Sequence, residues 1–178
     1  MKPHIREDES DVSELLCSLA GERLSRVTYV YPDAWCITDE TESDHVHEAG
    51  MDVVLHFAGG GHLKVSWAMA GLVEGLELSR NDVPRHGLMH VDASASPSWA
   101  RLLGQELNEP KALWRAANQD AAESIWWTGF TLHSGDSFSI TLGEMEDGIP
   151  DYKPNWLLVF FNEVQDHEFR KRTGRYWD

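Results

Sequence analysis

The sequence predicts an α+β protein of two related halves, each a helix followed by antiparallel hairpin strands, that share one core. Three observations predict this class: two stretches patterned as β-hairpins, a short L-x-G-x-x-L motif before each hairpin, and eight tryptophans in 178 residues. The expected divisions are a disordered N-terminus at 1–10, a first half at 11–92, and a second half at 93–178 that ends in a basic tail.

The helix of the first half is predicted within residues 11–24, DVSELLCSLAGERL. Asp11 and Glu14 have the spacing of a capping box. The apolar positions fit one helical face, formed by Leu15, Leu16, Leu19 and Leu24. A strand is predicted at 27–31, followed by an acidic loop at 38–52.

Residues 53–67, VVLHFAGGGHLKVSW, predict the first hairpin because apolar and polar side chains alternate on both sides of a glycine-rich turn. A phosphate-binding loop is excluded, since a strand rather than a helix follows the glycines and no GK[ST] motif is present. A further strand is predicted at 75–79, and residues 92–98 form the predicted joint between the halves.

The second helix is predicted to begin at Ser96, as N-cap, and Pro97, with an apolar face made by Trp99, Leu102, Leu103 and Leu107. Residues 111–117 fit either a helix or a strand. The second hairpin is predicted within 129–142, and a buried strand is predicted at 155–162.

Two offsets in residue number relate the sequences of the two predicted halves. A shift of 75 residues superposes five apolar positions of the hairpins: Leu55 on Phe130, Phe57 on Leu132, Leu63 on Phe138, Val65 on Ile140 and Trp67 on Leu142. A shift of 83 residues places Leu19, Gly21 and Leu24 on Leu102, Gly104 and Leu107. The interpretation is an ancient duplication of a unit of roughly 80 residues.

The charge balance points to the class of partner. With 30 acidic and 15 basic side chains, the formal net charge is −15. Such a chain repels nucleic acid and anionic membranes, and it attracts a basic protein. No signal peptide or long apolar run is present, so we expect a cytoplasmic protein with no membrane contact. We also expect Cys17 and Cys36 to be reduced thiols, with Cys17 in the core.

His45 and His47 are the candidate metal ligands. In an extended segment both point to one side, and Asp44 and Glu48 add oxygen ligands. The set lacks the further ligands that a closed site requires, so we predict no bound metal and no other cofactor.

No catalytic residue is predicted. The sequence has no G-x-S-x-G motif, and neither cysteine has a neighbouring base. The carboxylates within 144–151 are expected to be exposed to water, which leaves their acidities ordinary. An alternative function remains open: a small hydrolase or ligand-binding domain that uses a cleft between the halves, where Trp126, Trp127 and Trp156 would offer stacking surfaces.

Residues 139–162, SITLGEMEDGIPDYKPNWLLVFFN, together with the upstream L-x-G-x-x-L, resemble the strands of small uncharacterised bacterial proteins. Some proteins of that type accompany toxins as immunity partners, so the resemblance implies a binding protein rather than an enzyme.

The predicted function is therefore a non-enzymatic acidic protein that engages a basic protein partner in the manner of an immunity protein or inhibitor. The predicted partner-binding residues are an aromatic anchor, Trp35, and the charges Asp39, Glu40, Glu42, Asp44 and Glu48. The basic segment 170–177 fits two roles, docking onto the protein's own acidic surface or contacting a partner.

Overall fold

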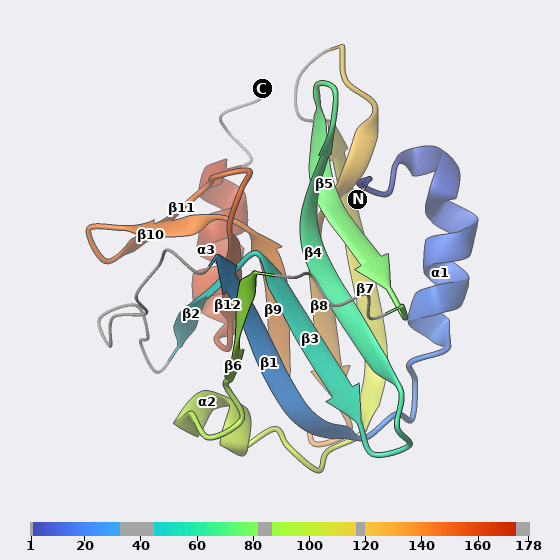
Figure 1. Cartoon of the computed structure of the whole chain (residues 1–178), viewed down its shortest axis with the longest axis vertical. Helices are drawn as coiled ribbons and strands as arrows, with labels where there is room; N and C mark the ends of the chain where they lie inside the picture. The colour runs from blue at the N-terminus through green and yellow to red at the C-terminus, as the bar shows by residue number, and fades with distance from the viewer. Residues whose placement is uncertain (1, 33–44, 82–86, 117–119, 174–178) are drawn as a thin grey trace.

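The computed structural model of the chain describes residues 2–32, 45–81, 87–116 and 120–173 (Figure 1). The chain is mostly β, with 53% in strands and 18% helical, so the predicted α+β class is wrong. Short helical elements lie beside one large sheet: η1 (Arg6–Asp8), α1 (Glu9–Cys17), α2 (Pro97–Ala100) and α3 (Glu163–Thr173).

The sheet is mixed, because β1 and β2 are parallel and the other neighbours are antiparallel. Its strand order is β5 (Val73–Ser79), β4 (His62–Ala70), β3 (Asp52–Phe57), β1 (Leu24–Pro32), β2 (Val46–Gly50), β12 (Leu157–Phe160), β9 (Ser137–Leu142), β8 (Glu123–Leu132) and β7 (Leu107–Ala116). Outside this path, β6 (Leu88–Asp92) pairs with β1, and β10 (Glu144–Glu146) with β11 (Ile149–Asp151) forms a separate ribbon. One sheet thus takes strands from both predicted halves, which are not helix-plus-hairpin units.

The sheet curls into a nearly closed, barrel-like form in which β5 approaches β8. The N-terminal segment joins these strands: the His4 N–H donates to the Leu76 carbonyl, and the Ile125 N–H donates to the His4 carbonyl, each at 3.1 Å. A Cβ at Gly75 would lie only 2.7 Å from the Ser124 Oγ, so a glycine permits this approach. Residues 2–10, for which the sequence predicts disorder, are therefore ordered against the sheet.

The two predicted hairpins are confirmed as β3–β4 and β8–β9. Leu55 pairs with Leu63 in the first, and Phe130 pairs with Phe138 in the second, as the shift of 75 requires. Both turns use a glycine with positive φ at the matching position, 87° at Gly60 and 91° at Gly135.

The L-x-G-x-x-L motifs are turns into strands rather than parts of helices. Gly21 and Gly104 have φ of 81° and 80°, which ends the helical path before Leu24 and Leu107 begin β1 and β7. The motifs also bond to each other: the Gly21 N–H donates to the Leu107 carbonyl at 2.8 Å, and the Gly104 N–H to the Leu24 carbonyl at 2.7 Å. The predicted helical faces that included both leucines are therefore wrong.

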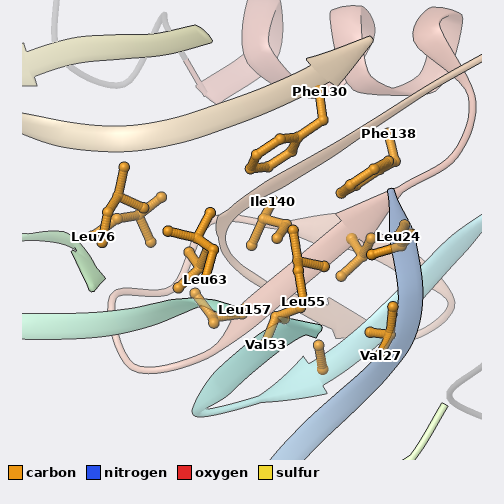
Figure 2. Packing of buried hydrophobic residues seen from close by; sticks show 14 of the residues in the cluster. Leu24, Val27, Val53, Leu55, Leu63, Leu76, Phe130, Phe138, Ile140 and Leu157 are labelled. Atoms are coloured by element: carbon orange, nitrogen blue, oxygen red, sulfur yellow. The ribbon is translucent and has the colours of Figure 1, made fainter. Parts of the chain in front are cut away.

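The core lies inside the curled sheet, where side chains from many strands meet (Figure 2). The rings of Phe130 and Phe138 stack with centroids 4.8 Å apart and planes at 16°. A buried polar chain runs beside them: the indole N–H of Trp99 donates to the Tyr29 oxygen at 2.6 Å, and that oxygen lies 2.9 Å from the Nδ1 of His47. A satisfied chain of this kind lets three polar groups be buried at little cost.

Several local expectations are resolved. Ser96 caps α2, since its Oγ accepts the Trp99 N–H at 3.3 Å. Residues 111–116 are part of the strand β7, and β2 forms within the segment predicted as an acidic loop. Cys17 is exposed rather than part of the core. Residues 170–173 of the predicted basic segment form the end of α3.

Candidate binding cleft

Most of the predicted partner-binding residues lie outside the described part of the chain: Trp35, Asp39, Glu40, Glu42 and Asp44. Glu48 is described, and it is half-buried on β2. Its carboxylate accepts the backbone N–H of Met145 at 2.9 Å, which attaches the β10–β11 ribbon to the sheet. Burial raises the pKa of Glu48, and the nearby Glu144 charge adds to the rise, while the hydrogen bond from Met145 opposes it.

The two candidate metal ligands have different environments. His45 is exposed, whereas His47 is only 1% exposed and packs edge-on against Phe161 with ring centroids 4.7 Å apart. In the ranges that the structure describes, no three metal-ligating side chains converge. The absence of a bound metal stays a prediction.

A cleft of about 550 Å³ lies between α3 and the face of β8–β9 that points away from the core. We call it the α3 cleft. The residues that define it here are Trp127, Gly129, Ser137, Ser139, Glu163, Asp166 and Arg170. In β9, small polar residues alternate with core residues, so this face of the sheet leaves room beside the helix.

Trp127 forms one wall of the α3 cleft. Its six-membered ring covers Gly129, where any Cβ would collide with it. Its indole N–H donates to the Asp166 Oδ1 at 2.8 Å. Glycine at 129 is therefore what allows the ring to lie flat along the strand toward α3.

Asp166 and Arg170 occupy one face of α3, four residues apart. Asp166 is only 6% exposed, and its second oxygen accepts the Arg170 Nε–H at 3.0 Å. The guanidinium carbon of Arg170 lies 4.9 Å from the Trp127 ring centroid, within the range of a cation–π contact. Both oxygens of the buried carboxylate are thus satisfied, and the guanidinium is held in one orientation.

Ser139 lies in the sheet beside Gly129 and Phe160, its cross-strand partners. The residue is 4% exposed, and its Oγ has no hydrogen-bond partner in the part of the chain that the structure describes. A buried polar group without a partner costs about 1–3 kcal/mol, so such groups are rare and call for a physical reason. In a cleft, a ligand that supplies the missing partner is one such reason.

The charges that line the α3 cleft sum to −2 with His167 neutral, because four carboxylates (Glu109, Glu163, Asp166 and Glu168) face two cations (Lys111 and Arg170). Glu109 pairs with Lys111 at 3.1 Å, and Asp166 with Arg170. Glu163 and Glu168 are exposed, and neither has an ion pair with any residue that the structure describes. The unneutralised charge of the cleft therefore lies at these two positions.

Two further hollows are present. A groove of about 700 Å³ between α1 and β7 adjoins the α3 cleft, with which it shares Lys111, Trp127 and Arg170. A smaller polar hollow of about 250 Å³ is lined by residues that include Arg26 and His56.

Sequence reasoning named Trp127 and placed Arg170 at the start of the basic segment 170–177, but it missed Ser139 and Asp166. All residues that line the α3 cleft fall between 109 and 170, so it lies within the second predicted half and not between the halves. The sequence held one unused indication of α3: Asn162 is a favourable N-cap, and its Oδ1 accepts the Val164 N–H at 2.9 Å.

The α3 cleft has the features of a binding site. Ser137 donates to Glu163 at 2.9 Å, and Ser139 has no partner among the described residues. Across the described ranges, no helix is long and apolar enough to cross a membrane. No family model, curated protein or solved structure matches the chain.

Proposed function

We propose that the chain is a non-enzymatic binding protein that holds a positively charged segment of a protein partner in the α3 cleft. The observation that carries the proposal is a preformed cleft with a lining charge of −2 on a chain whose net charge is −15. A basic partner gains from both the local and the overall charge, whereas an acidic partner is repelled by both.

The exposed carboxylates give the local part of this attraction. Glu163 and Glu168 lie on the first turns of α3, at the rim of the cleft. Lysine or arginine side chains of a partner segment would pair with them, while apolar parts of the segment contact Trp127. The charges predicted at residues 39–48 would add to the long-range attraction, which depends on total charge.

A second candidate function is small-ligand binding. The volume of about 550 Å³ falls within the range of small-molecule pockets, and this observation favours it. Such a ligand would bind without the dependence on ionic strength that a highly charged segment shows.

The proposal is tested with short peptides that differ only in net charge, titrated into the full chain while tryptophan fluorescence is recorded. Basic peptides should bind, and their association rate should fall as salt rises. Acidic and neutral peptides of matched length should bind at least about tenfold more weakly.

A matched pair of variants locates the site. Glu163→Lys with Glu168→Lys reverses the two rim charges, and Glu7→Lys with Glu14→Lys makes the same change in net charge at exposed positions outside the cleft. The rim variant should slow association more than the control. Equal effects of the two variants, or peptide binding that ignores charge and salt, would contradict the proposal.

A further inference from the structure

We infer that the α3 cleft recognises the chain-terminal carboxylate of the basic segment through the Arg170 guanidinium and the Ser139 hydroxyl. The inference rests on the proposed function, because it specifies which group of the segment enters the cleft.

The first argument is an excess of hydrogen-bond donors. Arg170 donates its Nε–H to Asp166, and its two Nη nitrogens have no hydrogen-bond partner among residues 2–32, 45–81, 87–116 and 120–173. A guanidinium presents its N–H groups as a planar fork that matches the two oxygens of a carboxylate. Because Asp166 and Trp127 fix the orientation of this fork, little side-chain entropy is lost when an anion binds.

Ser139 adds a second donor. Ser139 lines the same cleft, and its hydroxyl is buried without a partner among the described residues, so a ligand oxygen that reaches it removes an existing penalty. A water molecule is a poorer partner for the guanidinium than a carboxylate, because the water oxygen is neutral and the carboxylate pairs with the guanidinium as an ion.

The acceptors of Asp166 and Asn162 are already engaged, whereas the rim carboxylates Glu163 and Glu168 keep oxygens that accept no hydrogen bond from the described residues. Both oxygens of Asp166 accept hydrogen bonds, Glu163 accepts from Ser137, and the Asn162 Oδ1 accepts from the backbone of α3. Beside Arg170 the acceptor therefore has to come from the ligand, while basic side chains of the ligand pair with the rim carboxylates Glu163 and Glu168.

The net charge of the chain indicates which kind of ligand bears the carboxylate. A small free anion would approach a chain of charge −15 against its field, and it would find the rim carboxylates Glu163 and Glu168 beside the site. A carboxylate at the end of a basic segment is accompanied by lysine or arginine side chains, and these can pair with Glu163 and Glu168. A C-terminal residue also fits a cleft more easily than an internal residue, because no further residues follow it that would have to leave the cleft.

The test compares one basic peptide in two forms, with a free C-terminal carboxylate and with a C-terminal amide. The free acid should bind at least about tenfold more tightly, since hydrogen bonds to charged groups contribute about 1.5–3 kcal/mol. Arg170→Lys and Ser139→Ala should each remove most of the difference between acid and amide.

Two controls are matched to these changes. Arg23→Lys and Ser25→Ala alter exposed residues that do not line the cleft, and they should preserve the preference for the acid. Thermal unfolding of each variant establishes that it is folded. Ser139→Ala keeps the test valid if Arg170→Lys proves unstable, because it removes a hydroxyl that has no partner.

The outcomes separate the two proposals. Equal binding of acid and amide, with the charge preference intact, overturns the carboxylate inference and leaves the proposed function standing. Binding of acetate alone as tightly as the basic acid peptide overturns the basic segment as carrier. A peptide with an internal glutamate and an amide end that binds as tightly as the acid overturns the assignment to a chain end.

Discussion

Replacement of Ser139 by alanine should stabilise the unliganded protein, which is the reverse of the usual effect of a buried substitution. The hydroxyl is buried, with the residue 4% exposed, and its Oγ has no partner in the ranges that the structure describes. An unsatisfied buried polar group costs about 1–3 kcal/mol, and alanine removes it while losing the packing contacts of only one oxygen. We expect a net gain of about 1 kcal/mol in the free energy of unfolding, or a rise of about 2–4 °C in Tm for a chain of this size.

Ser124→Ala is the matched control. Ser124 is 1% exposed on β8, but its Oγ donates to the Glu74 carbonyl at 2.5 Å. Its removal breaks a bond and leaves a buried acceptor, so the free energy of unfolding should fall by about 1 kcal/mol or more. Urea unfolding followed by tryptophan fluorescence gives both values. If both alanine variants are destabilised to the same extent, the Ser139 hydroxyl is satisfied, and the α3 cleft loses its unpartnered donor.

Three further predictions use other parts of the chain. Gly75→Ala should lower the free energy of unfolding by about 1–3 kcal/mol, because the new Cβ would lie 2.7 Å from the Ser124 Oγ; an unchanged urea midpoint would contradict this. Since its pKa is raised above 4.5, Glu48 binds its proton more tightly in the folded state, and the stability it contributes is lost as pH rises through the folded pKa. Glu48→Gln should therefore flatten the fall of unfolding free energy with rising pH, and an unchanged slope would refute the assignment. Cys17 and Cys36 should both react in a thiol titration under denaturing conditions without reductant, whereas a count of zero would reveal a disulfide.

The hairpins were predictable because their local pattern determines both the turn and the pairing. Alternation fixes which side chains face the core, and a glycine that can adopt positive φ fixes the tip. The observed pairs, Leu55 with Leu63 and Phe130 with Phe138, are centred on Gly59 and Ser134, one residue before the glycine with positive φ in each turn.

The fold class was not predictable from the same pattern, because helical spacing and strand onset compete at the L-x-G-x-x-L motifs. Leu19 and Leu24 fit a helical face by spacing, but Gly21 adopts a φ of 81° and separates α1 from β1. The motifs of the two segments then bond to each other, a long-range arrangement that no local spacing reveals.

β2 and α3 were missed for opposite reasons. β2 is an internal strand of the sheet, with four of its five residues buried, so the alternation that marks a half-buried strand is absent. Its sequence, VHEAG, instead suggested part of an acidic loop. α3 is strongly polar, which concealed it within a predicted basic tail, although acidic residues in its first turn and basic residues in its last are typical of a helix.

The α3 cleft shows why a binding site of this kind escapes local sequence reasoning. Ser137 and Ser139 are equivalent in the alternation of β9, and both point away from the core. They differ only once α3 is in place, because Ser137 then reaches Glu163, while Ser139 is buried with no partner among the described residues. The feature that marks the site is thus an absent hydrogen bond, which depends on strand register and on the position of a helix that begins more than twenty residues later. Such a feature belongs to the folded chain as a whole, so a ligand is better inferred from unsatisfied donors in the structure than from a motif.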